Sequence, residues 1–556
     1  MWTVHDMNEG KPRFERFGGI DIFRPGWRAT IMLRNEAEAH FRSVFKPGEY
    51  VGREIVNRAL QHHFGFYANK LSDILPSIAS RDYIEFVLHQ YEQSVLVDQF
   101  PTGNSFSEQN SISWQQTGSK LRRALKYLAE RTVLLWPPET AAINADHAQM
   151  LRQAEMALIC AEQLIDLYMT SDKVFSSFSE ETVLEVLPEG QLEVFRTHTP
   201  CDFTSTFLER VHRDAKHRST YVPLHGLHQI PRLQDTYLAD AFRDTIGLPY
   251  SDVLAVLHVV IDHAIPPPKG FQIPFCFRDR IVDEVVKHAG FPRHAVENSL
   301  AGFTVSRAGM TAEGREVFKP KQEYRAYRRG FFEMPHDSGT HLTWSKGMAQ
   351  ECYVLLLTEL ALKQIPAEWR STSVEAAVSR LCNAVGNWFE ALVAQNMNKI
   401  GIIGLHSVER VIGRGRVSVR IPPEVGEIDF IGYSARDDAI IVSECKYVRG
   451  GTESRFFRDE IKAFTEGNGC HMKQLARKVE WVAQNFQDVR AALADALDTP
   501  AASEARRILS AMLTHYPNCA GYFWSDAPCV SLTELMLDYQ EHNRWPYSSG
   551  IHEHLP

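Results

Sequence analysis

Residues 426–448 read GEIDFIGYSARDDAIIVSECKYV. Two runs rich in β-branched and aromatic residues flank the polar stretch ARDD, and this pattern predicts a β-hairpin. Alternate residues of a strand share a face. Glu427 and Asp429 therefore lie on one face of the first strand, and Glu444 and Lys446 lie on one face of the second.

The position of the turn decides which residues face each other across this hairpin. With the turn centred between Arg436 and Asp437, Asp429 lies opposite Glu444. A turn shifted by one residue places Asp429 opposite Lys446. Directly opposed side chains have Cβ atoms about 4.5–5.5 Å apart. Either register therefore brings Asp429 against the second strand's acid and lysine.

Two carboxylates and an ammonium on one face need a chemical reason. Close carboxylates repel each other and raise each other's pKa, and a divalent cation between them removes that penalty. Mg²⁺ prefers oxygen ligands, can polarise a phosphate oxygen and lowers the pKa of bound water. The hairpin thus predicts a site of phosphodiester hydrolysis. On this argument, replacing Asp429 or Glu444 by Ala abolishes cleavage and leaves thermal stability unchanged or slightly raised.

The pattern D-x(14)-E-x-K, with its GEID and ECK strings on adjacent strands, resembles the PD-(D/E)xK nuclease superfamily. That group includes restriction endonucleases and archaeal-type Holliday-junction resolvases. The resemblance covers roughly residues 371–490. It implies that Asp429 and Glu444 bind Mg²⁺ or Mn²⁺, that the backbone carbonyl of Cys445 is a further ligand, and that Asp429, Glu444 and Lys446 are catalytic.

Further positions match the superfamily less directly. Its members often add a Glu from the preceding helix in a G-x-x-F-E pattern, and the string GNWFE ends at Glu390, which we therefore expect to be catalytic. Ile428 replaces the proline of the family name, as is common in the GEID branch. Glu427 is a second-line candidate because it shares the face of Asp429. Lys473 and Gln474 are also second-line, because related nucleases place a Gln or Lys of the following helix near the scissile phosphate.

A bland interpretation of the same residues stays open. Charged residues at the end of a hairpin are often a solvated edge with no chemical role. A nuclease-like fold without activity is a further alternative, although every key residue type is present here.

A second segment, residues 317–332, reads VFKPKQEYRAYRRGFF. Cations neutralise phosphates and aromatic rings can stack on unpaired bases. The pattern predicts a nucleic-acid-binding surface, and the alternative is a basic helix face with its aromatic residues packed inward. The predicted nucleic-acid-binding residues are Lys319, Lys321, Arg325, Arg328 and Arg329.

Length and pattern predict about three domains in the 556 residues. Residues 1–180 read as helical. Residues 181–368 read as mixed and mainly helical, with a small β-hairpin at 183–196. Residues 369–556 read as a restriction-endonuclease-like α/β domain, a central mixed sheet flanked by helices, with a C-terminal helical extension.

Composition restricts the class of protein. The net charge of −9 excludes a wholly basic surface, although not a local basic groove. Nine cysteines, an odd number without a C-x-x-C pair, suit a reducing compartment, so we expect a cytoplasmic protein. Apolar runs are far shorter than the ~18 residues that a membrane span needs. No Walker A loop, dinucleotide-binding glycine motif or G-x-S-x-G elbow occurs.

The sequence therefore predicts a Mg²⁺- or Mn²⁺-dependent endonuclease whose partner is nucleic acid, with DNA favoured over RNA by the resemblance alone. One alternative is a non-catalytic nucleic-acid-binding or scaffold protein with a nuclease-like fold, and another is a structure-selective junction or flap nuclease. A nuclease module joined to a large helical region is similar in plan to bacterial anti-phage effectors. Pairing with a second copy or with a protein of a multi-component system stays open.

Overall fold

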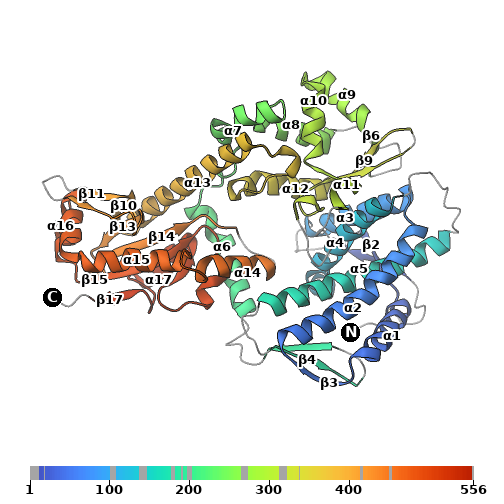
Figure 1. The fold of residues 1–556 in the computed structure, drawn as a ribbon, viewed down its shortest axis with the longest axis horizontal. Helices are drawn as coiled ribbons and strands as arrows, with labels where there is room; N and C mark the ends of the chain where they lie inside the picture. The colour runs from blue at the N-terminus through green and yellow to red at the C-terminus, as the bar shows by residue number, and fades with distance from the viewer. Residues whose placement is uncertain are drawn as a thin grey trace. The chain divides into compact units, whose positions relative to one another are not determined.

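The structure is a computed structural model, and its contacts divide the chain into two compact units (Figure 1). Unit 1 comprises residues 1–198, 234–360 and 364–377, and unit 2 comprises residues 199–233, 361–363 and 378–556. The residues described are 12–17, 19–99, 108–136, 147–176, 182–188, 192–196, 203–263, 273–311, 322–336, 338–412, 418–449 and 454–553.

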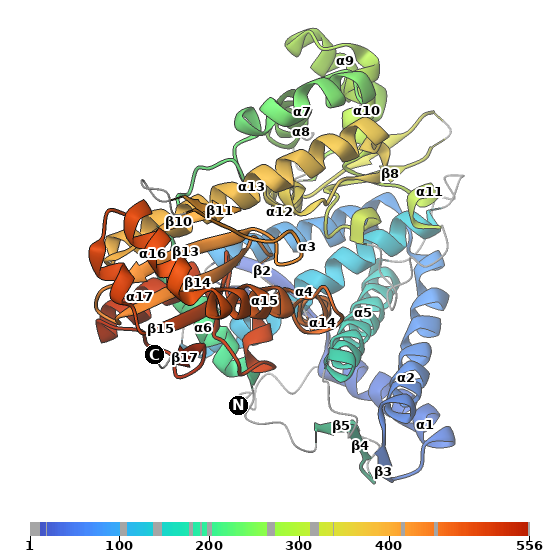
Figure 2. The same cartoon turned by 60° about the vertical axis from the view of Figure 1, so that its left-hand side comes forward.

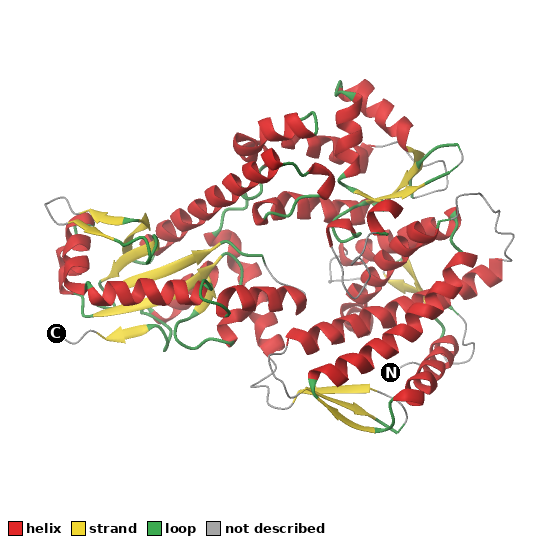
Figure 3. Cartoon of the chain, viewed as in Figure 1, coloured by secondary structure: helices red, strands yellow, loops and turns green. Residues whose placement is uncertain are grey.

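In its described residues unit 1 is mainly helical, with three small sheets (Figure 3). Its helices are α1 (Trp27–Val44), α2 (Arg53–Ile74), α3 (Arg81–Gln99), α4 (Glu108–Leu135), α5 (His147–Ser176), most of α7 (Pro231–Thr245), α8 (Tyr250–His263), α9 (Arg278–Ala289), α10 (Arg293–Ala301), α11 (Arg307–Met310) and α12 (Lys346–Glu359). Its sheets are the hairpin β1 (Arg13–Phe17) with β2 (Ile20–Arg24), the set β3 (Gly48–Val51), β4 (Thr182–Val186) and β5 (Leu192–Arg196), and the set β6 (Phe275–Phe277), β9 (His341–Thr343), β8 (Phe331–Met334) and β7 (Thr304–Val305).

The helical periodicity of the first 180 residues is confirmed by α2 to α5, and the predicted hairpin at 183–196 is confirmed by β4 and β5. The sequence did not reveal that β3 pairs with β4, nor did it reveal the β1–β2 hairpin or the four-stranded sheet. These strands have two to five residues. Such lengths are too short for a two-residue period to stand out.

The helices of the described residues have up to 30 residues. No single helix there is both long and apolar enough to cross a membrane. Helices α7 and α8 pass that test only when taken together, with a 75° bend between them. Apolar residues of both, including Phe242 and Leu254, are buried within unit 1.

Unit 2 combines helices with one larger sheet (Figures 1 and 3). Its elements are α6 (Phe203–Tyr221), most of α13 (Thr372–Lys399), β10 (Ile402–Val408), β11 (Arg410–Ile412), β12 (Ser418–Arg420), β13 (Ile428–Ser434), β14 (Ala439–Lys446), α14 (Ser454–Thr465), α15 (His471–Gln484), α16 (Phe486–Ala496), β15 (Arg507–Thr514), β16 (Cys529–Ser531), α17 (Leu532–His542) and β17 (Ile551–Glu553).

The large sheet has the order β10-β13-β14-β15-β16. Strand β17 also pairs with β15, along the part of that strand that does not pair with β16. Strands β10, β13 and β14 are antiparallel, whereas β14, β15 and β16 run parallel. The described part of unit 2 therefore contains the predicted mixed sheet. The C-terminal residues are not simply the expected helical extension, because β15 lies inside the sheet. Its eight residues are almost all buried, and a short, continuously apolar run does not distinguish a strand from a helix.

Helices cover both faces of this sheet (Figure 2). Leu475 and Val482 of α15, together with α16, pack on the face that carries Ile431 and Val442. Helices α13 and α17 pack on the opposite face, which carries the alternate strand residues such as Ile441. Strand residues whose side chains point toward α15 are therefore buried, whether they are polar or apolar.

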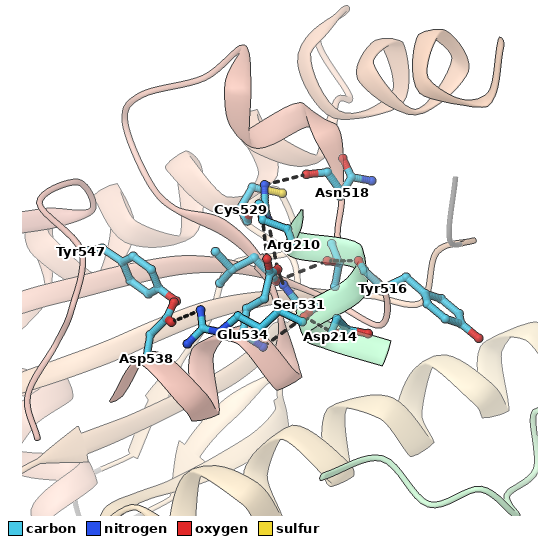
Figure 4. Close-up of polar contacts among 12 residues, drawn as sticks. Arg210, Asp214, Tyr516, Asn518, Cys529, Ser531, Glu534, Asp538 and Tyr547 are labelled. Carbon is cyan, nitrogen blue, oxygen red and sulfur yellow. Dashed lines mark hydrogen bonds and ion pairs between the residues drawn. The ribbon is translucent and has the colours of Figure 1, made fainter. Parts of the chain in front are cut away.

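Helix α6 was expected within the middle region of the chain, but it belongs to unit 2 (Figure 4). Arg210 donates to both carboxylate oxygens of Glu534 over 2.6 and 3.0 Å. Ser531, which caps α17, donates its hydroxyl to Asp214 over 2.6 Å. These buried, charge-assisted contacts explain why a segment so distant in sequence folds with the sheet.

Candidate active site

The hairpin adopts the first of the two predicted registers. The ladder of paired residues between β13 and β14 begins at Phe430 and Ser443. Continued by one residue, it places Asp429 opposite Glu444. Both carboxylates lie on the face toward α15, and both are buried, with 7% of Asp429 and 1% of Glu444 exposed.

The turn that sets this register is held by a buried acid. Asp437 accepts hydrogen bonds from the hydroxyls of Ser434 (2.6 Å) and Tyr539 (2.7 Å) and from the backbone amide of Trp545 (2.8 Å). The next residue, Asp438, has φ of 50°, in the left-handed region that Asp tolerates in turns. A slip by one residue would break all three hydrogen bonds, so the position of Asp429 is fixed from the far end of the hairpin.

Asp429 and Glu444 each bind two donors. Oδ2 of Asp429 accepts from the backbone amide of Cys445 over 2.8 Å, and Oδ1 accepts from Nζ of Lys478 over 2.6 Å. Oε1 of Glu444 lies 2.5 Å from Nζ of Lys446, while its Oε2 accepts from the same Lys478 ammonium. Two carboxylates thus converge on one shared cation.

Lys478 is the site residue that sequence reasoning missed. It lies on α15, and only 5% of it is exposed. Burial works against its charged form, but Glu444 and Asp429 outweigh that effect, so its pKa is raised. Residues three or four positions apart lie on the same face of a helix. Lys478 lies four residues after Gln474 and three after the buried Leu475, so the helical spacing was a signal that could have identified it.

Lys446 is more accessible, with 24% of its side chain exposed. Its ammonium lies 3.8 Å from Oδ2 of Asp429, in addition to its contact with Glu444. Burial again works against the charge, and the two carboxylates again raise the pKa. His471, the first residue of α15, has its pKa lowered to about 4 by burial and by the positive charge of Lys446.

Glu390 enters the site from α13. Its Oε2 accepts a hydrogen bond from Oγ of Ser407 over 2.5 Å. Ser407 lies on β10 opposite Asp429, between two paired positions, with φ of 53°. The pKa of Glu390 is raised to about 7, mainly by burial; the charges of Asp429 and Glu427 contribute to the rise and the hydrogen bond from Ser407 opposes it.

Glu427 is exposed, just ahead of β13. The pKa of Glu427 is nevertheless raised: partial burial is the largest cause, and the negative charges of Asp429 and Glu409 add to the rise. Its electrostatic link to Asp429 and Glu390 keeps it a peripheral member of the acidic group.

The helix that carries Glu390 matches its sequence pattern. Phe389, the neighbouring residue of the G-x-x-F-E string, is fully buried against the sheet. Gly401 follows the helix end, and its φ of 85° is the left-handed conformation in which glycine is favoured.

The second-line residues of α15 make other contacts. Lys473 is exposed, with Nζ 3.5 Å from Oδ1 of Asn468. Gln474 donates to the carbonyl of Gly469 over 2.9 Å and contacts His471. The structure therefore brings Lys478, rather than Lys473 or Gln474, against the hairpin acids.

The basic segment lies in unit 1, and its described arginines are buried in ion pairs. Arg325 pairs with Glu130, and its Nε lies 2.6 Å from Oε2 of that residue. Arg328 pairs with Glu359 over 2.6 Å. Side-chain exposure of both arginines is 11%. Lys319 and Lys321 lie outside the described residues.

Arg329 is the most enclosed of the three, with 2% of its side chain exposed. It donates to both oxygens of Glu368 over 3.0 and 2.6 Å and to the carbonyls of Glu323 and Thr304. Phe331 of the same segment is fully buried. The aromatic residue Phe331 is thus packed inward as the alternative predicted, but the described segment is a 3-10 turn and strand β8 rather than a helix, and its arginines are buried as well. Arg325, Arg328 and Arg329 therefore do not form an exposed surface for phosphates.

The donor set fits a divalent ion that keeps several waters. Among the described residues, no group of three or more His, Cys, Asp or Glu side chains is placed to hold a metal. Mg²⁺ is commonly held by only one or two carboxylates together with water and substrate phosphate. The oxygens of Asp429 and Glu444 already converge on a single cationic centre, which is the arrangement such an ion requires.

Comparison with protein-family models, curated proteins and solved structures finds no match to this chain.

Proposed function

We propose that unit 2 is a divalent-metal-dependent nuclease that hydrolyses phosphodiester bonds, with DNA favoured over RNA. The observation that carries the proposal is the convergence of the Asp429 and Glu444 carboxylates on one cationic point at the end of the hairpin, with Lys446 beside them. Asp429, Glu444 and the backbone carbonyl of Cys445 are the proposed ligands. When bound, Mg²⁺ or Mn²⁺ supplies Lewis-acid stabilisation of phosphate charge and a more acidic water.

The remaining roles belong to side chains of this chain. Lys446, partly exposed and next to Glu444, orients the attacking water and stabilises charge that develops on the phosphoryl group. Glu390, whose pKa is raised to about 7, is placed to accept a proton near neutral pH. In the reaction the water oxygen bonds to phosphorus as one phosphorus–oxygen ester bond breaks, and the leaving oxygen takes up a proton.

One observation favours the non-catalytic alternative. The position between the two acids is held by Lys478, so the described arrangement is electrically balanced without a metal. A protein that only binds nucleic acid would keep this ion-pair cluster permanently. Junction or flap selectivity remains a refinement of the nuclease proposal, and so does action in cytoplasmic anti-phage defence.

A cleavage assay with the full chain tests the proposal. Supercoiled plasmid, linear duplex, single-stranded DNA, branched DNA and RNA are each incubated with Mg²⁺, Mn²⁺ or EDTA. We expect cleavage with either metal and none in EDTA, and none with Asp429→Asn, which keeps the shape of the side chain. Metal-independent cleavage, or equal cleavage by Asp429→Asn, would exclude this site.

A further inference from the structure

Lys478 is held in place by the helix that carries it. The α15 residues around it, Leu475, Val479 and Val482, are buried in the core beneath the sheet. This packing fixes the rotation of the helix and points position 478 at the hairpin acids. A buried ammonium is tolerated only when it is paired, and Asp429 and Glu444 are its partners.

The oxygens that bind Lys478 are the ones that a divalent ion needs. Nζ of Lys478 lies 2.6 Å from Oδ1 of Asp429, whereas Mg²⁺ binds oxygen at about 2.0–2.1 Å. Two cations cannot share the same carboxylate oxygens at such distances without strong repulsion. With Lys446 and Lys478 in place, two positive charges already balance the charges of Asp429 and Glu444.

We propose that Lys478 competes with the metal for Asp429 and Glu444. Its ammonium leaves the two carboxylates only when a divalent ion and a phosphodiester bind together. The inference rests on the proposed function and adds its regulation. Once a metal displaces it, the Lys478 ammonium lacks its acidic partners in a buried setting, and this state is costly. A substrate phosphate supplies a new partner, so metal and nucleic acid strengthen each other's binding, as linkage requires.

This coupling has a consequence for the resting protein. Without nucleic acid, the carboxylates stay paired with Lys478 and the divalent ion binds weakly. The hydrolytic metal therefore binds tightly only when substrate is bound, so the protein without nucleic acid holds little metal at this site.

The first test measures Mn²⁺ binding to the full chain by calorimetry, without nucleic acid. Lys478→Met removes the charge and keeps most of the apolar stem. We expect its dissociation constant for Mn²⁺ to fall at least about tenfold from wild type. Arg477→Met is the matched control, because it removes one positive charge from an exposed neighbouring position and is expected to leave the constant unchanged.

The second test needs no variant and covers the case in which Lys478→Met does not fold. Mn²⁺ binding to wild type is measured with and without a short duplex whose linkages resist cleavage. We expect the duplex to tighten Mn²⁺ binding at least about tenfold. Unchanged affinity in this titration overturns the inference.

The outcomes separate this inference from the proposed function. If Asp429→Asn loses Mn²⁺ binding but Lys478→Met binds no tighter than wild type, the metal site stands and the competition by Lys478 is refuted. If wild type and Lys478→Met both fail to bind Mn²⁺, even with the duplex, then the metal-dependent nuclease proposal fails and the inference fails with it.

Discussion

Nζ of Lys478 lies 2.6 Å from Oδ1 of Asp429, a contact between residues 49 positions apart in the chain. The same ammonium contacts Glu444, which is only 1% exposed. The sequence-based expectation, that removing either acid leaves stability unchanged or slightly raised, depended on repulsion between the two acids. The buried Lys478 ammonium offsets that repulsion. The expected effect of removing either acid on stability changes sign.

Asp429→Ala in the absence of metal is now expected to lower the free energy of unfolding. The substitution takes one of two acidic partners from the buried Lys478, and breaking a buried ion pair typically costs about 3–5 kcal/mol. Urea denaturation in EDTA at pH 7.5 measures the change. Glu480→Ala, an exposed acid on α15, is the control and is expected to change stability by less than about 0.5 kcal/mol. An Asp429→Ala protein as stable as wild type would show that Lys478 is not held by this pair.

Glu390 gives a pH-dependent prediction. Its pKa is about 7 in the folded protein and about 4.5 as an ordinary glutamate. A raised carboxyl pKa means that folding favours the protonated form, so its stabilising effect is complete below about pH 4.5 and is lost as pH rises through 7. Glu390→Gln removes this dependence. Denaturation in EDTA at pH 5, 6, 7 and 8 should show that the variant gains stability relative to wild type toward pH 8; parallel curves would refute the raised pKa.

Arg329 gives a prediction that differs from the sequence-based one. Charge reversal at a surface arginine would weaken nucleic-acid binding and flatten its salt dependence. Because Arg329 is buried against Glu368, we expect Arg329→Glu to destabilise unit 1 instead, by about 3–5 kcal/mol or more. Thermal denaturation measures this, with Arg506→Glu, 85% exposed, as the control. A folded Arg329→Glu protein with a flattened salt dependence would restore the nucleic-acid interpretation.

The sequence predicted what is local in the site and missed what is distant. Strand alternation and turn length limited the partner of Asp429 to Glu444 or Lys446, because hairpin register is a short-range property, and the structure adopts the first of these two registers. Helix α14 and the segments on either side of it separate Lys478 from Glu444 in the chain, and the partners of Lys478 depend on how α15 packs. A cationic segment such as the one around Arg325 gives the same pattern whether its charges face solvent or buried acids. The positions of the acidic partners, such as Glu130, which is far away in the chain, distinguish the two cases.

The last prediction separates binding from chemistry at Lys446. Its ammonium lies 2.5 Å from Glu444 and is more exposed than that of Lys478, so it is the cation available to a reacting phosphate. Interactions that are stronger in the transition state than in the ground state change rate more than affinity.

Lys446→Met keeps the apolar stem, so lost packing is not mistaken for lost chemistry. We expect it to bind nucleic acid about as well as wild type and to bind Mn²⁺ at least as tightly, while its cleavage rate falls by on the order of 10²-fold or more, the usual effect of removing one charge-stabilising donor. Single-turnover cleavage at saturating protein decides the point, because weak binding is then compensated by concentration. If Lys446 only held the phosphate, saturation would restore the wild-type rate, and Lys446 would belong to binding alone. If the cleavage rate stays low at saturation and the dissociation constant for nucleic acid is unchanged, Lys446 acts in the chemical step.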